Sequence, residues 1–301
     1  MALTLLQLVQ AVTSELGLPA PNAVISNSDT QIQQIYSFIN RLGRDLARDY
    51  DWQELVKSYV FSTSALTTTG VWTAGSAIIT GIPSTASLST DWDASNIGLP
   101  AYAQIVSVDS TTQVTVNQVA LTSGSGSIVF SRNQYALPSD WGRQVPQSEW
   151  DRTQHWPLAG PATGQQWGYL QGGIVSTGPW LRFRIYGSKF AVNPDPPNAS
   201  TLSMEYISNA WVITASTGVR KVAYTADTDT CIYDDSMMIL GTKMLWRQEK
   251  GFESSIVERD FRVLLEACSA QNASAPKLNM APRPASMLLG PWSVPAGNWP
   301  S

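Results

Sequence analysis

The chain has few charged residues and almost no histidine or cysteine. Charged residues make up 14% of its 301 residues, against about 25% in an average globular protein. His155 is the only histidine, which disfavours catalytic triads, proton shuttles and histidine metal sites. Cys231 and Cys268 are too few and too isolated for a disulfide framework or a zinc site, so they favour a reducing compartment.

Sequence motifs for phosphate, dinucleotide or acyl chemistry are also missing. The chain has no P-loop, no dinucleotide fingerprint and no nucleophile elbow. It has no run of 18 apolar residues, and its first 16 residues lack the basic segment of a signal peptide. We therefore expect no enzyme activity, no cofactor, no metal site and no membrane insertion.

The charge balance argues against a surface that grips nucleic acid. The net charge is −4, and the densest group of basic residues is Arg41, Arg44 and Arg48. Three acidic residues interleave with or follow this group: Asp45, Asp49 and Asp51. A mildly acidic protein of this kind would let DNA slide past without sequence-specific binding.

Paired acidic residues are the main candidates for chemistry. The pairs are Asp91/Asp93, Asp227/Asp229 and Asp234/Asp235. A glycan hydrolase would need two carboxylates that face each other across a cleft. The Asp227 pair could also ligate calcium, but it lacks the glycine and distal glutamate of an EF-hand loop. Because acids also cap helices and solvate loops, we favour structural roles for all three pairs.

The C-terminal stretch 271–301 combines many prolines with apolar side chains. Its prolines favour an extended, polyproline-like arm that cannot fold alone. Because a disordered linker rarely carries so much apolar surface, we expect the arm to lie in a groove of a neighbouring subunit or partner, or else to wrap its own chain. The predicted anchors are Met287, Leu288, Leu289, Trp292 and Trp299. The many uncharged polar residues and 12 tryptophans also favour self-association, although tryptophan can equally fill a β core.

Helical patterns lie near both ends of the folded part. We predict helices over 4–16, 28–50 and 234–270, with capping boxes at Thr4 with Gln7 and Ser28 with Gln31. Gly251 predicts a kink or break in the last helix. In that helix the predicted apolar stripe includes Phe252 and Ile256.

Residues between these helices are typical of strands. Stretch 70–131 is rich in Thr, Ser, Val and Gly and nearly uncharged, which predicts a small β-barrel or sandwich inserted into a host domain. A hairpin connection is expected at 109–112. A second β region runs over 134–233, with strands at 181–186, 189–192 and 201–208. In the first of these, Arg182 and Arg184 alternate with apolar residues, so the strand has a basic face that is half-solvated or contacts a partner.

These patterns predict a two-domain α+β protein. Its core would comprise residues 1–66 and 132–270, with a helical bundle built from N- and C-terminal helices plus an antiparallel β domain. The inserted small β-barrel or sandwich would comprise 67–131, and the extended C-terminal arm 271–301.

Several stretches resemble a known family of phage proteins. They are 38–52 (FINRLGRDLARDYDW), 135–143 (YALPSDWGR), 181–185 (LRFRI), 202–206 (LSMEY) and 234–246, which begins DDS. In this order they resemble the head-to-tail adaptor proteins of tailed bacteriophages, a group that includes the tail tubular proteins of short-tailed phages. The resemblance covers about 1–60 and 134–270.

The resemblance implies a non-enzymatic virion protein. Family members form a ring, commonly of twelve copies, between the portal protein and the tail nozzle protein, around the channel through which DNA passes. They are assembled in the host cytoplasm and carry C-terminal arms that grip the portal or a neighbouring subunit. We expect a neutral or negative channel wall. The main alternative is a carbohydrate-binding tail or receptor protein with exposed aromatics at Trp141, Trp150, Trp156 and Trp167.

Overall fold

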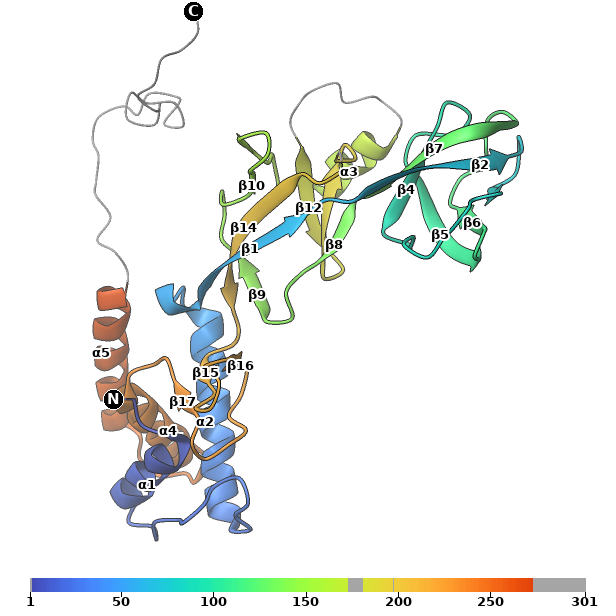
Figure 1. The fold of residues 1–301 in the computed structure, drawn as a ribbon. Coiled ribbons are helices and arrows are strands. Elements are labelled where there is room, and N and C mark those ends of the chain that lie inside the picture. The colour runs from blue at the N-terminus through green and yellow to red at the C-terminus, as the bar shows by residue number, and fades with distance from the viewer. Residues whose placement is uncertain (1, 173–180, 197, 273–301) are drawn as a thin grey trace, which may run out of the picture.

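Helices form from the two ends of the chain and strands fill the middle. The computed structural model describes residues 2–172, 181–196 and 198–272 (Figure 1). The five predicted arm anchors, from Met287 to Trp299, lie outside the described residues. The described helices are α1 (Leu5–Leu16), α2 (Thr30–Asp49), α3 (Gly164–Gln171), α4 (Asp235–Glu249) and α5 (Ser255–Asn272).

The strands pair antiparallel in three open sheets and one closed barrel, so the predicted α+β class is confirmed. One sheet contains β1 (Val56–Ser62), β14 (Thr201–Ser208), β10 (Trp150–Asp151), β11 (Trp156–Pro157) and β9 (Trp141–Gln144). A second has the order β12 (Arg182–Tyr186), β13 (Lys189–Asn193) and β8 (Gln134–Ala136). A small third has the order β16 (Arg220–Lys221), β15 (Val212–Ile213) and β17 (Thr230–Cys231).

The predicted inserted β unit is a closed barrel and not a sandwich. Its order is β2 (Ala65–Trp72), β3 (Ile78–Thr80), β6 (Gln113–Val116), β5 (Ala103–Ser110), β4 (Trp92–Ser95) and β7 (Gly124–Arg132). The predicted connection at 109–112 is too long, because β5 continues to Ser110 and leaves a two-residue turn. The barrel has its own apolar core, which includes Ile79, Ile128 and Phe130. Closure leaves this sheet without free edges.

Local signals place most helix boundaries correctly. Thr4 and Gln7 form the predicted capping box of α1. The predicted Ser28 cap of α2 is wrong, because Asp29 is the N-cap and accepts the Gln31 backbone N–H at 2.8 Å. Gly251 has φ of +72° and separates α4 from α5, which confirms the predicted break.

Helix α3 was not predicted, because 134–233 was interpreted as strands alone. Thr163 and Gln166 form a capping box at its start, the same signal that identified α1. The region around it is dominated by turns and short strands, and the helix is only 8 residues long. It buries Trp167 and Leu170, which form a small apolar cluster with Ala191 of β13.

Helices α1, α2, α4 and α5 contribute to one apolar core, together with residues from the loops between β14 and α4. Trp211, fully buried, packs against α2 at Gly43. A Cβ atom at Gly43 would lie 2.3 Å from the Trp211 ring, so only glycine allows this close approach. Figure 1 shows these helices at one end of the molecule, the sheets of β1 and β12 in the middle and the barrel at the far end.

Candidate assembly surfaces and junctions

Helix α5 has two apolar faces, of which only one is covered in the described residues. Val257 and Phe261 are buried, and Leu264, Leu265 and Cys268 pack against the helical core. On the opposite face Ile256 is 62% exposed and Val263 is 63% exposed. Helical spacing aligns these two side chains with Ala267 and Ala270, which are also exposed. We call this stripe of Ile256, Val263, Ala267 and Ala270 the outer face of α5.

The structure corrects the prediction that Phe252 and Ile256 belong to the core stripe of the last helix. Both side chains are exposed. The break at Gly251 interrupts the helical period. Residues after it that continue the apolar spacing of α4 in the sequence therefore do not lie on the same face as the apolar residues of α4. The sequence signal for the outer face is the second apolar stripe at Ile256 and Val263, spaced by two helical turns.

Arg182 and Arg184 lie on β12, at one edge of the three-stranded sheet. The predicted alternation is present in part: Phe183 is buried and Arg182 is exposed, while Ile185 is half-buried. The Arg184 guanidinium lies 5.2 Å from the Tyr186 ring centroid, a cation–π arrangement. Neither arginine forms an ion pair within the described part of the chain.

The backbone edge of β12 is covered by the segment before α3. Ala159 N–H donates to Leu181 O at 2.9 Å, Phe183 N–H donates to Ala159 O at 3.0 Å, and Ala162 N–H donates to Phe183 O at 2.9 Å. Strand addition at this edge is therefore blocked. A partner at β12 would have to contact side chains, and Arg182 lines a hollow of about 400 Å³ with Gly160 and Leu170 that is open to such contact.

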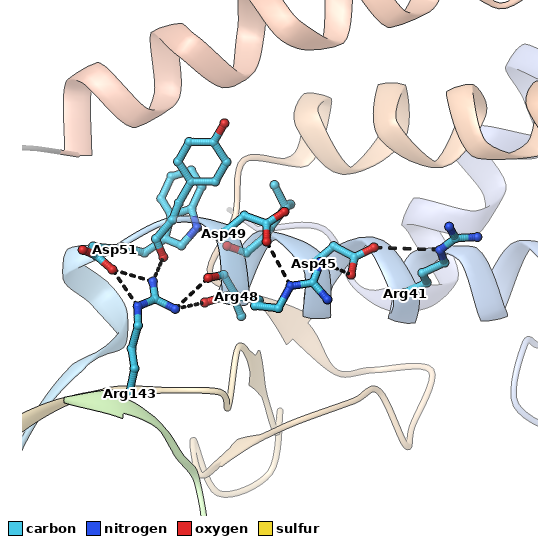
Figure 2. Close-up of polar contacts among 10 residues, drawn as sticks. Arg41, Asp45, Arg48, Asp49, Asp51 and Arg143 are labelled. Atoms are coloured by element: carbon cyan, nitrogen blue, oxygen red, sulfur yellow. Dashed lines mark hydrogen bonds and ion pairs between the residues drawn. The ribbon is translucent and has the colours of Figure 1, made fainter.

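Two of the three arginines on α2, Arg41 and Arg48, are engaged with acids, as Figure 2 shows. Arg44 instead donates to the Asn40 backbone oxygen at 3.1 Å. Arg48 pairs with Asp45 at 3.2 Å and with Asp49 at 3.0 Å, and Arg41 lies 3.8 Å from Asp45. All of these side chains are largely exposed, so each pair adds little stability. Their effect is to lower the positive potential that phosphates would require.

Arg143 of β9 joins the sheet to the C-terminal end of α2 (Figure 2). Its guanidinium donates to the backbone oxygens of Ala47 at 3.1 Å, Arg48 at 2.8 Å and Tyr50 at 2.6 Å, and to Asp51 Oδ1 at 2.8 Å. The last carbonyls of a helix have no partners within it and carry partial negative charge, so a planar guanidinium suits this position. We call this group the arginine junction.

Asp140, the residue directly before β9, joins the same region to β1 and β14. Its carboxylate accepts from Lys57 Nζ at 2.6 Å, Tyr206 OH at 2.8 Å and Ser208 Oγ at 2.6 Å. Burial raises the pKa of Asp140, but these hydrogen bonds outweigh burial and lower its pKa to about 2. Asp140 is therefore a fully satisfied anion at neutral pH.

Two of the three acid pairs have local structural partners. Asp234 caps α4 and Asp235 accepts the Leu3 backbone N–H at 3.0 Å. Asp227 accepts backbone N–H groups of Val24 and Ile25, and Asp229 forms an ion pair with Lys221 at 2.7 Å. These contacts give both pairs structural roles.

The third pair divides between two environments at the base of the barrel. Asp91 pairs with Lys189 and lies 3.7 Å from Arg132. Asp93 is buried without a cationic partner: burial, and then the charge of Asp195, raise its pKa to about 8. Burial also raises the pKa of Asp195 to about 6. Asp195 was not among the predicted candidates, because its signal lies in the turn NPDPP and has no spacing relation to Asp93.

The four tryptophans of the carbohydrate-binding alternative do not gather on one exposed face. Trp167 is buried, and Trp141 stacks on Tyr206 with ring centroids 5.3 Å apart. Trp150 and Trp156 are half-buried neighbours on β10 and β11. Throughout residues 2–172, 181–196 and 198–272, no tryptophan is mostly exposed.

No model of a known protein family matches the chain, and no curated protein matches it. In the described ranges no helix is both long and apolar enough to cross a bilayer.

Proposed function

We propose that the chain is the subunit of a homo-oligomeric ring, a head-to-tail adaptor in the neck of a tailed phage. In this proposal about twelve subunits join the portal protein to the tail nozzle protein around the DNA channel. The helices α1, α2, α4 and α5 form the adaptor's bundle, and the chain beyond α5 supplies the arm that grips the portal or a neighbouring subunit. The chain catalyses no reaction in this role.

The observation that carries the proposal is the outer face of α5. A helix that is apolar on two opposite faces can bury only one of them in the core of its own subunit, so the other face requires a second partner. A ring supplies the second partner, because heterologous contacts present a different surface of the next subunit to each helix. The predicted arm also follows α5 directly, so one helix would lead from the subunit core to the neighbour.

A second support is that the stretches which resemble the family contact one another. Arg143, in stretch 135–143, bonds to Asp51 in stretch 38–52. Asp140, in stretch 135–143, bonds to Tyr206 in stretch 202–206. Residues far apart in the chain thus build one framework, which favours a family fold over chance similarity.

Mass photometry of the purified full chain, alone and mixed with the portal protein, tests the proposal. We expect rings, and we expect Val263→Asp to abolish them, because a carboxylate cannot be buried in an apolar contact without a partner. The matched control is Val219→Asp, which places the same charge at a valine that is 61% exposed in the loop before β16.

Two results would count against the proposal, and one control is needed to interpret them. Rings that persist in Val263→Asp would exclude the outer face of α5 as the ring contact. Monomers in all conditions, with or without portal protein, would overturn the adaptor proposal. Circular dichroism melting of both variants separates lost assembly from lost folding, since both substitutions are at exposed positions.

A further inference from the structure

The place where the barrel meets the sheets, here called the barrel junction, contains two carboxylates, Asp93 and Asp195, with no basic side chain among the described residues paired to either. Asp93 lies on β4 of the barrel and is 1% exposed. Asp195 follows β13 of the three-stranded sheet and is half-buried. Between them in sequence, Asn133 links β7 of the barrel to β8 of the sheet and is 4% exposed. Each part of the molecule that meets here thus supplies one polar side chain.

Three oxygens of these side chains are buried and have no hydrogen-bond donor in the described part of the chain. Asn133 Nδ2 donates to Asp93 Oδ2, which fixes the two side chains against each other. Asp93 Oδ1, Asn133 Oδ1 and Asp195 Oδ1 are left unpartnered. A buried polar oxygen without a partner costs several kcal/mol in general, so two carboxylate oxygens and one amide oxygen at one junction require an explanation.

The neighbouring basic side chains do not act as partners for these three oxygens. Lys189 and Arg132 both engage Asp91, the residue directly before β4. Asp195 belongs to this junction because β13, the strand before it, bonds to Asn133: the Val192 N–H donates to Asn133 O at 2.8 Å. Burial first, and then the charge of Asp195, raise the pKa of Asp93. Tyr102, at the same junction, donates its hydroxyl hydrogen to Asn193 Oδ1 at 3.2 Å, so it does not reach the three free oxygens.

We propose that Asp93, Asn133 and Asp195 bind a Ca²⁺ ion at this junction. Ca²⁺ takes 6–8 oxygen ligands from carboxylates, amide carbonyls and water in irregular geometry, and the free atoms here are two carboxylate oxygens and one amide oxygen. The partial exposure of Asp195 provides a route for the ion and for water ligands. Because the ligands come from the barrel, the linker and the sheet side, the ion would fix the barrel to the rest of the subunit.

Terbium luminescence on the full chain is the direct test. Tb³⁺ replaces Ca²⁺ at oxygen sites and emits when a nearby aromatic ring absorbs light. Trp92 directly precedes Asp93 on β4, and the Tyr102 hydroxyl bonds to Asn193, two residues before Asp195. We expect Tb³⁺ emission that millimolar Ca²⁺ displaces. We also expect the melting temperature to be higher by about 3 °C or more in excess Ca²⁺ than in EDTA.

Variants assign the site. Asp93→Asn and Asp195→Asn should each weaken Ca²⁺ displacement of Tb³⁺ at least tenfold. Asp195 is half-buried, so its variant keeps the test available should Asp93→Asn fold poorly. The control is Asp109→Asn, an exposed acid elsewhere on the barrel that bonds to Ser107 and Thr115, which should leave both readouts unchanged.

Two outcomes would overturn the calcium proposal. One is the absence of Tb³⁺ emission together with equal melting temperatures in Ca²⁺ and EDTA. The other is emission that Asp93→Asn and Asp195→Asn leave intact, which would mean that the ion binds elsewhere. A melting temperature that rises on acidification and does not change with Ca²⁺ would also contradict the proposal. It would show that a proton, and not a metal ion, removes the repulsion between Asp93 and Asp195.

Discussion

The two junctions of this molecule differ in whether their side-chain charges are matched within the chain. At the arginine junction, Arg143 reaches three backbone oxygens and one carboxylate, so the charge is matched within the chain. At the barrel junction, Asp93 and Asp195 repel each other and leave oxygens without donors. The first junction is complete in the subunit alone, whereas the second requires a cation or a proton from outside.

This difference parallels how the chain is connected at each place. The helices and the β1–β14 sheet are joined through several chain segments, because α1 and α2 precede β1 while α4 and α5 follow β14. The barrel is inserted between β1 and β8 and is joined at only its two ends. A unit held by two adjacent strands depends more strongly on the polar contacts at its base.

Removal of Arg143 should change the free energy of unfolding more than any other substitution considered below. Arg143→Ala would leave the last carbonyls of α2 without donors and should lower the free energy of unfolding by about 3 kcal/mol, measured by urea denaturation. Arg48→Ala removes only exposed ion pairs and should cost less than about 0.5 kcal/mol. Equal costs for the two variants would contradict the special role of Arg143.

The apolar side of the same junction should respond to added volume. Gly43→Ala introduces a methyl group 2.3 Å from the rigid Trp211 ring and should cost about 2 kcal/mol, although alanine is the better helix former. The control is Gly168→Ala in α3, where a Cβ meets no atom within 4 Å. That variant should be neutral or slightly stabilised in thermal melts.

Asp140 should give the sheet side of this junction an acid-sensitive stability. Its folded pKa of about 2 lies below the unfolded value of about 3.9. Its contribution is therefore present above about pH 4 and is lost as the pH falls towards 2. Asp140→Asn should cost about 1 to 2 kcal/mol at pH 7, and the difference from the native chain should shrink in acid. A difference that stays constant from pH 7 to 3 would refute this assignment.

The barrel junction should show a smaller effect of opposite sign. In EDTA at pH 7, Asp93→Asn replaces a buried carboxyl whose raised pKa, about 8, makes proton uptake a cost of folding. The variant should therefore raise the free energy of unfolding by about 1 kcal/mol. In excess Ca²⁺ the same variant should be less stable than the native chain, because it has lost a ligand. If Asp93→Asn destabilised the chain equally in EDTA and in Ca²⁺, the barrel junction would not depend on an external cation, and the contrast with the arginine junction would be wrong.

Local sequence signals predicted much of the fold. The Thr4–Gln7 box, the break at Gly251 and the strand Thr201–Ser208 depend on neighbours a few residues apart, and all three are present. Helix α3 has an equally local signal at Thr163 and Gln166 that the surrounding turns obscured. The predicted interface residues divide differently: Arg182 and Arg184 are placed on an edge strand, while the arm anchors stay a prediction.

The sequence by itself determined the fold class, the insertion of a β unit and the low charge of the surface, because these follow from composition and from short periodicities. Only the tertiary structure decided which apolar face of α5 is left outside, that Arg143 meets the end of α2, and that Asp93 and Asp195 lie close enough to repel. Such relations join residues about 100 positions apart. No local pattern encodes them, since they arise only when packing fixes the distances between distant segments.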